Sequence, residues 1–181
     1  MTNLVSPHEA LILDACCAIN LFATDHSGAI LRSIGCPVVV ARFVVEQELL
    51  SLAALSLSGN QSLEDQLARH ATTIIELEEA EEELFFSLAA QMDDGEAITS
   101  AVAISRHWAV ATDERKVGAI LKRVAPAIRV VTTPELVKHW VETSVIDDFT
   151  LRSVLADIES KARFRPWRAH PLYDWWHSSV W

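Results

Sequence analysis

The sequence predicts an α/β sandwich in which helices flank a mostly parallel central sheet. Short apolar runs, several of them β-branched, alternate along the chain with longer segments whose apolar residues recur at helical spacing. No internal repeat or low-complexity linker interrupts this alternation, and five Gly and six Pro are too few for a loop-rich fold. A chain of 181 residues is long enough for one such domain around a single core.

Short apolar runs are predicted as strands. The first run stops at Asp14, and the second is β-branched. In chain order the expected strands are residues 10–13, 37–41, 72–77, 109–111 and 128–131. Because helical segments separate these runs, we expect the strands to pair mostly in parallel.

The segments between the strands are predicted as helices, and their ends carry ordinary signals. Gly35 follows one helix, Asp93-Asp94-Gly95 separates two others, and Pro134 lies in a first turn, where its missing N–H costs nothing. Helices are expected over residues 15–22, 27–34, 44–57, 62–70, 79–91, 96–108 and 115–124, in a segment near Pro134, and from Asp147 or Asp148 to about Lys161.

The composition favours a reduced, cytoplasmic protein without a membrane anchor. No apolar run approaches the roughly 20 residues that span a bilayer. The first four residues carry no basic segment ahead of an apolar stretch, so we expect no secretory signal. The cysteines Cys16, Cys17 and Cys36 are odd in number and lack metal-ligand spacing.

The formal net charge of -10 argues against a protein that coats nucleic acid non-specifically, because such binding depends on phosphate neutralisation. The charge is uneven, however. Cations cluster in residues 115–123 and again in residues 161–168. The net charge therefore neither supports nor excludes an RNA substrate.

Acidic residues from distant parts of the chain are expected to meet at one edge of the sheet. Asp14 and Asp113 each follow a predicted strand, and Glu96 lies in the first turn of a helix. Glu46 and Glu48 come shortly after the second strand. Ligands of open parallel sheets bind outside the carboxyl ends of the strands. Carboxylates gathered there repel one another, and a hard cation such as Mg²⁺ removes that repulsion and can activate water for attack on a phosphodiester.

The segments that carry these acids resemble the motifs of PIN-domain ribonucleases of the VapC-like kind. Residues 11–16 (LILDAC) resemble the opening strand and first acid, and residues 45–49 (VEQEL) are similar to the second motif. Residues 93–97 (DDGEA) resemble the Asp-x-Gly-Glu-Ala signature of one subgroup. Residues 110–115 (VATDER) look like the fourth motif, Thr-x-Asp or Thr-Asp followed by a basic residue. The four occur in family order, with family-like spacing, over roughly residues 9–132.

The resemblance implies a PIN-like three-layer sandwich over residues 1–162, followed by a tryptophan-rich tail at residues 163–181. It implies metal-dependent endonucleolytic cleavage of RNA. It further implies the toxin of a toxin–antitoxin pair, which binds a small antitoxin protein and forms a homodimer. By the same resemblance, Mg²⁺ or Mn²⁺ would be held by Asp14, Glu48, Glu96 and Asp113.

Several of these residues also have a simpler structural interpretation. Asp14, Glu96 and Asp113 could each cap or begin a helix. Glu46 and Glu48 point in different directions on a helix, so only one can face the site, and we choose Glu48 because Leu49 follows it as in the family motif.

Three further groups of residues are interpreted as structural. The glutamates of residues 76–83 are expected to form a solvated helix face. Asn20 is expected to be a surface or capping residue. Aromatic and arginine side chains of the tail are expected to pack against the domain, a second subunit or an antitoxin, with base stacking as the alternative.

Two other functions compete with the nuclease. A catalytically inactive PIN-like module that binds protein or RNA would keep the fold without the chemistry. A phosphatase-like hydrolase with an Asp nucleophile is disfavoured, because no second Asp follows Asp14 two residues on. Divalent-metal binding at the acids would separate the nuclease from the inactive module.

Overall fold

A five-stranded, all-parallel sheet forms the centre of the computed structural model, which describes residues 4–50 and 62–180. The strands lie in the order β3-β2-β1-β4-β5. Their bounds are β1 Leu11–Leu13, β2 Val38–Ala41, β3 Thr73–Ile75, β4 Ala109–Ala111 and β5 Val130–Val131. The predicted α/β fold with a parallel sheet flanked by helices is confirmed.

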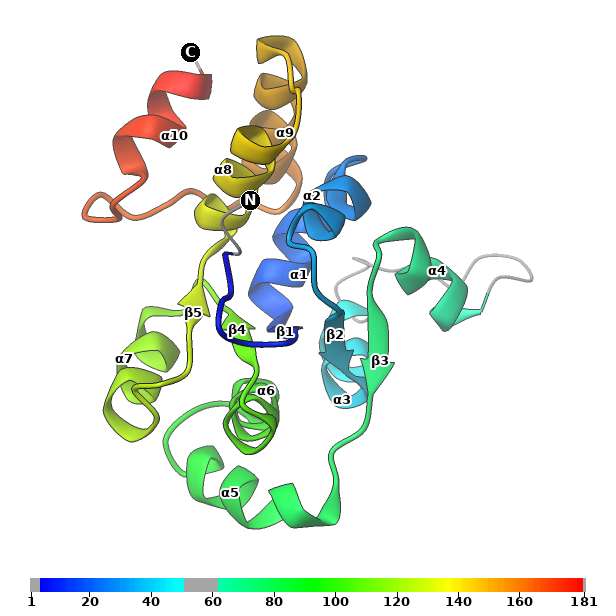
Figure 1. Ribbon diagram of the computed structural model, residues 1–181, viewed down its shortest axis with the longest axis vertical. Coiled ribbons are helices and arrows are strands. Elements are labelled where there is room, and N and C mark those ends of the chain that lie inside the picture. The colour runs from blue at the N-terminus through cyan, green and yellow to red at the C-terminus, as the bar shows by residue number, and fades with distance from the viewer. Residues whose placement is uncertain (1–3, 51–61, 181) are drawn as a thin grey trace.

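Helices cover both faces of this sheet and make a three-layer arrangement (Figure 1). On one face lie α1 Ala15–Phe22, α2 Ser27–Ser33, α8 Thr133–Thr143, α9 Asp148–Lys161 and α10 Tyr173–Val180. On the other lie α5 Glu79–Ala89, α6 Asp94–Arg106 and α7 Arg115–Val124. Near the β2–β3 edge lie α3 Arg42–Val44, the π-helical turn η1 Val45–Leu49, and α4 Leu63–Arg69.

Alternation along the strands divides the core between the two faces. Leu11 and Leu13 of β1 belong to the cluster under α1, α2 and α8, whereas Ile12 between them belongs to the cluster under α6 and α7. Side chains of successive strand residues point to opposite faces of a sheet. Because helices cover both faces here, all three β1 side chains are fully buried. This two-sided burial explains why the strands read as continuous apolar runs.

The chain after β2 differs from the single helix expected over residues 44–57. It begins with the short α3 and continues as η1, where the Leu50 N–H donates to the Val45 carbonyl. The rest of that expected helix, residues 51–57, lies outside the described residues. Helix α10 was not expected at all.

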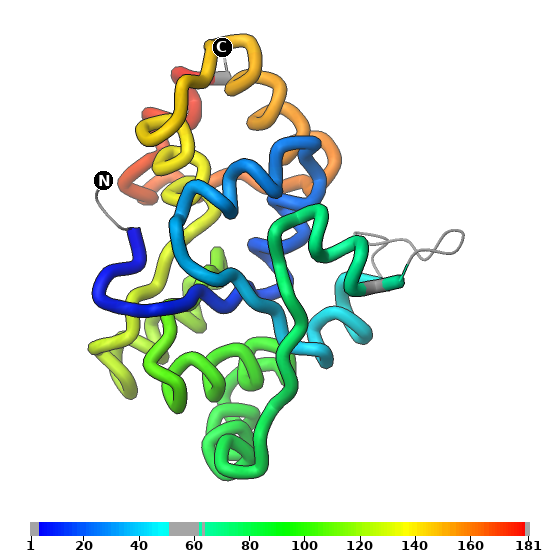
Figure 2. Tube along the Cα trace, turned by 45° about the vertical axis from the view of Figure 1, so that its right-hand side comes forward, coloured from blue at the N-terminus to red at the C-terminus, as the bar shows by residue number. Residues whose placement is uncertain are grey.

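The C-terminal segment packs against the domain, as expected of its aromatic residues. Trp176 of α10 is fully buried in the main core cluster, and Phe164 and Trp175 pack against that cluster. Figures 1 and 2 show α10 beside α9, at the end of the molecule away from α5 and α6. The ring N–H of Trp176 donates to Glu159 of α9 at 3.0 Å.

One residue of the glutamate-rich stretch departs from the expected solvated face. Glu81 is 3% exposed and accepts two hydrogen bonds from Arg106, at 2.6 and 2.8 Å, one on each carboxylate oxygen. A third bond, from the Glu78 N–H at 2.8 Å, makes Glu81 part of a capping box at the start of α5. Glu81 therefore joins α5 to the end of α6, while Glu78, Glu79, Glu82 and Glu83 are exposed as expected.

We expect Glu81→Gln to lower the free energy of unfolding by about 1–3 kcal/mol near neutral pH, because it leaves a half-buried guanidinium poorly paired. Burial raises the pKa of Glu81, but the bonds from Arg106 and the Glu78 N–H outweigh it and hold the pKa below its usual value. A depressed folded-state pKa stabilises the fold above the unfolded pKa of about 4.3 and loses that stabilisation as pH falls through the folded value. Urea unfolding of both proteins from pH 7 to pH 3 should therefore show the difference shrinking in acid.

The exposed neighbour Glu82 provides the control for this substitution. Glu82→Gln should change stability by less than about 0.5 kcal/mol, as surface substitutions do. An equal loss in the two variants would show that the Glu81–Arg106 pair makes no specific contribution.

Within the described part of the chain, no helix is both long and apolar enough to cross a membrane.

Candidate metal centre

Acidic side chains line a pocket of about 370 Å³ at the carboxyl ends of the strands. Asp14 directly follows β1, Glu48 lies in η1 after β2, and Glu96 lies in the first turn of α6. The remaining lining residues are Ala15, Cys16, Phe43, Asp93, Asp94, Gly95 and Glu114. The structure thus brings together three of the four acids expected from the sequence.

Asp14 is held in place by three donors and is 3% exposed. One carboxylate oxygen accepts from the N–H of Ala15 at 2.9 Å. The other accepts from the hydroxyl of Thr112 at 2.8 Å and the thiol of Cys16 at 3.2 Å. Burial raises the pKa of Asp14, and these bonds offset part of the rise because they favour the ionised form.

The pocket acids also raise one another's pKa. Burial raises the pKa of Glu48, and the charges of Asp14, Glu96 and Asp93 raise it further. Burial likewise raises the pKa of Glu96, its bond from the Asp93 N–H lowers it, and the charges of Asp14, Asp93 and Glu114 add to the rise. Five carboxylates therefore share one region of negative potential, which is the condition that a bound cation relieves.

Asp113 does not line this pocket. One of its oxygens accepts from the Thr133 N–H at 2.9 Å. The other accepts from the Thr133 hydroxyl at 2.5 Å, the Asn20 amide at 2.9 Å and the Cys17 thiol at 3.3 Å. Burial raises the pKa of Asp113 and these bonds lower it; none of the pocket acids contributes to the shift. The carboxylate ties β4 to α1 and α8 instead.

This arrangement also corrects the expectation for Asn20. Its side chain is 4% exposed rather than at the surface. The amide donates to Asp113 and, at 3.3 Å, to the Thr133 hydroxyl. Asn20 is therefore a buried partner of Asp113, one turn after Cys17 in α1.

Glu114, the next residue, lines the pocket in place of Asp113. Its N–H donates to the Thr112 hydroxyl at 3.1 Å, so the same threonine positions both Asp14 and the start of α7. The sequence held a signal for this residue, because Thr112 and Glu114 have the Thr-x-acid spacing that is one form of the fourth motif. The residue expected at this place from the sequence is the adjacent Asp113.

Glu46 lies outside the pocket, as the choice of Glu48 expected. It is exposed and pairs with Arg42 at 3.5 Å, one turn earlier. Arg42 also pairs with Glu76 and, at 4.0 Å, with Glu64. Glu46 thus belongs to a surface ion-pair network rather than to the acid cluster.

Gly95 forms a cradle for the Glu48 carboxylate. A Cβ at this position would overlap Glu48 Oε1, and it would lie 3.1 Å from Glu48 Cδ. The absence of a side chain lets Glu48 reach across from η1 to the start of α6. Carboxylate oxygens are the type of ligand that Mg²⁺ and Mn²⁺ prefer, and several carboxylates line this one pocket.

A second group of potential ligands lies behind Asp14. Cys16, Cys17 and Asp113 have ligand atoms within 4.8 Å of one another. Cys17 is fully buried, and burial raises the pKa of its thiol well above the usual value, so it stays protonated. With Asp113 already satisfied by hydrogen bonds, this group has the chemistry of a packed interior rather than of a Mg²⁺ or Mn²⁺ site.

Fold and pocket together define an α/β protein with a carboxylate pocket at the carboxyl edge of a parallel sheet. No family model, curated protein or solved structure matches this chain.

Proposed function

We propose that the protein is a Mg²⁺- or Mn²⁺-dependent endoribonuclease that hydrolyses RNA phosphodiester bonds. The observation that carries the proposal is that Asp14, Glu48 and Glu96, from three distant stretches of chain, line one pocket. The same three residues lie in the segments that resemble PIN-domain motifs. A cytoplasmic toxin that forms a homodimer and binds a small antitoxin protein is the biological setting that this resemblance favours.

The residues that would hold the ion are Asp14, Glu48, Glu96 and Glu114, and Asp93 also lines the pocket. A bound ion supplies two things: it lowers the pKa of water to make a nucleophile, and it neutralises charge on the phosphate oxygens. The chain itself orients the ligands. Thr112 and the Ala15 N–H fix the Asp14 carboxylate, and Gly95 leaves room for that of Glu48.

Features around the pocket suit single-stranded RNA. Arg115 and Lys116 are exposed and directly follow Glu114, where they can neutralise backbone phosphates. Phe43 lines the pocket and is 37% exposed, so its ring offers a face on which a base can stack.

The test is cleavage of a fluorescently labelled single-stranded RNA with Mn²⁺, with Mg²⁺ and with EDTA. It compares the wild type with two matched variants, Glu48→Gln and Glu46→Gln, whose positions are two residues apart. Glu48→Gln should lower the rate more than about 100-fold, because even indirect partners of a catalytic metal are worth roughly 10- to 100-fold. Glu46→Gln should keep the wild-type rate, since its carboxylate pairs with Arg42 outside the pocket. Calorimetric Mn²⁺ titration should show the same contrast in affinity.

Each other outcome has a definite meaning. Cleavage that persists in EDTA, or a greater loss in Glu46→Gln than in Glu48→Gln, contradicts the proposed site. Mn²⁺ binding that Glu48→Gln abolishes, without cleavage of any RNA by the wild type, would identify the inactive binding module instead.

Gly95→Ala should weaken Mn²⁺ binding and RNA cleavage at least about tenfold without destabilising the fold. The new methyl group overlaps the end of a flexible side chain, so the Glu48 carboxylate must swing out of the pocket. Alanine is the better helix former, so thermal unfolding should stay the same or rise slightly. The control is Gly118→Ala in α7, where a Cβ would meet nothing within 4 Å. A Gly95→Ala protein with wild-type Mn²⁺ affinity would show that the position of Glu48 does not matter.

A further inference from the structure

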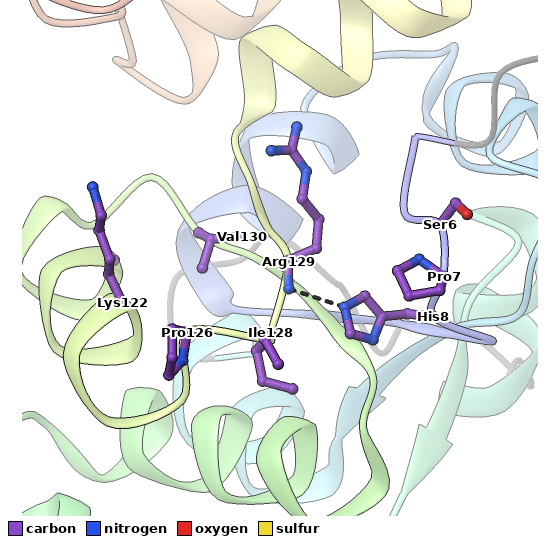
Figure 3. Close-up of a pocket in the computed structure, with 10 residues that line it drawn as sticks. Ser6, Pro7, His8, Lys122, Pro126, Ile128, Arg129 and Val130 are labelled. Carbon is purple, nitrogen blue, oxygen red and sulfur yellow. Dashed lines mark hydrogen bonds between the residues drawn. The ribbon is translucent and has the colours of Figure 1, made fainter.

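A second pocket, of about 400 Å³, lies at the amino-terminal edge of the sheet, opposite the carboxylate pocket (Figure 3). Three stretches of chain form its walls: the segment before β1, one side of α7, and the loop that leads into β5. Much of its wall is apolar, supplied by Pro7, Pro126, Ile128 and Val130. The proposed nuclease chemistry makes no use of this pocket.

His8 fixes one wall by joining the N-terminal segment to two neighbouring stretches. The side chain is 8% exposed. Its Nε2 accepts from the Arg129 N–H at 3.1 Å, the contact drawn in Figure 3. Its Nδ1 therefore carries the proton and donates to the His107 carbonyl at 2.7 Å. With both ring nitrogens engaged, this wall is preformed.

Gly118 lies on the opposite wall of the pocket, at a position where the packing of the fold does not require a glycine. It lies inside α7, where glycine is about 1 kcal/mol less favourable than alanine. A Cβ at this position would meet no atom within 4 Å, so no close packing requires a glycine. The missing side chain instead leaves space in the pocket that Gly118 lines.

Lys122 places a positive charge on the same face of α7, one turn after Gly118. Within residues 4–50 and 62–180 it forms no ion pair. The other cation of the lining, Arg129, pairs with Glu135 at 2.8 Å, and in Figure 3 its guanidinium points away from Ile128. The pocket thus combines an apolar wall with one available ammonium group.

We propose that this pocket binds a small organic anion with an apolar body. The ring or chain of the ligand packs against Pro7, Pro126 and Ile128, and its acidic group contacts Lys122. Small-molecule sites in proteins have this composition, a mostly apolar cavity with a few fixed polar groups.

The test uses 3-phenylpropionate as the probe and its neutral amide as the comparison, both titrated into the full chain and followed by ¹⁵N–¹H NMR. The Arg129 amide is a direct reporter, because its N–H is bonded to His8 in the pocket wall. We expect 3-phenylpropionate to shift the NMR signal of the Arg129 N–H saturably, with a dissociation constant on the order of 1 mM. The neutral amide form of the probe should bind several-fold more weakly. In Lys122→Gln the affinity for 3-phenylpropionate should fall to that for its neutral amide, whereas Lys116→Gln, on another face of α7, should keep the wild-type affinity.

A pair of leucine substitutions tests the cavity itself. Gly118→Leu fills the space and should abolish the shifts, while Ala119→Leu, at an exposed position outside the lining, should bind as wild type. Absence of saturable shifts in the wild type, or wild-type binding by Gly118→Leu, overturns the proposal. Equal binding of the acid and the amide overturns the role of Lys122, and that comparison needs no variant to fold.

Discussion

Asp14→Asn is expected to abolish metal-dependent RNA cleavage while leaving the fold intact. Asparagine keeps the shape of the side chain and an oxygen that can accept from the Ala15 N–H, but it removes one of the negative charges that line the pocket. The rate should fall more than about 100-fold, since even a partner that only orients a metal ligand is worth roughly 10- to 100-fold. The Thr112 hydroxyl and the Cys16 thiol, which donate to the second oxygen, can turn to accept from the new amide. Repulsion with Glu48 and Glu96 also disappears, so the metal-free protein should melt at the same or a higher temperature. Initial cleavage rates and thermal melts with and without Mn²⁺ measure both effects.

Asp113→Asn is the informative comparison, because it should show the opposite pattern. The Asp113 carboxylate accepts bonds from Thr133, Asn20 and Cys17, and an amide group would place N–H donors against some of these donors. We expect a loss of about 1–3 kcal/mol in unfolding free energy, with Mn²⁺ affinity kept by the folded molecules. Full activity of Asp14→Asn would contradict the proposed mechanism. A stable but inactive Asp113→Asn, with Glu114→Gln fully active, would return Asp113 to the ligand set.

The contrast between Asp113 and Glu114 shows where sequence reasoning on the site stops. The sequence predicts that acids after parallel strands, and one in the first turn of a helix, gather at the carboxyl edge, and Asp14, Glu48 and Glu96 do so. Which of two consecutive residues after β4 faces the pocket depends on the turn. That turn is fixed by hydrogen bonds from Asn20 and Thr133, residues 93 and 20 positions away in sequence. Local pattern carries no information about such partners.

The same limit applies to the parts of the fold that sequence analysis missed. The strands β1, β2 and β4 were predictable because each is a short apolar run buried on both faces of the sheet, whereas the edge strands β3 and β5 are only partly buried. Glu81 looked like one more solvated glutamate, and only the approach of Arg106 from the end of α6 makes it a buried link. Helix α10 has eight residues, too few to be stable alone, so its formation depends on packing rather than on intrinsic helix propensity.

Trp176→Ala is expected to be the most destabilising single substitution proposed for this chain. Trp176 is fully buried in the core cluster, packs edge-on against Phe164 at 5.9 Å between ring centroids, and donates to Glu159. Removing a buried tryptophan side chain costs about 3–5 kcal/mol, through lost burial and the cavity left behind. At roughly 2–4 °C per kcal/mol for a chain of this size, the melting temperature should fall by about 10 °C. Calorimetry or thermal circular dichroism measures the shift.

Two further variants test which property of Trp176 stabilises the fold. One removes its hydrogen bond but keeps a buried ring, and the other removes an exposed ring elsewhere. Trp176→Phe keeps most of the ring but loses the N–H, so it should cost less than Trp176→Ala and leave in place the ion pair of Glu159 with Arg165, at 2.7 Å. Phe149→Ala removes a ring of α9 that is 83% exposed, and it should change stability by less than about 0.5 kcal/mol. Ending the chain after Ala162 should destabilise at least as much as Trp176→Ala, because it uncovers the surface under the whole C-terminal segment. A truncated protein with wild-type stability would show that α10 docks on the domain without supporting it. In that case the aromatic residues of the tail would have to act through a partner or through RNA.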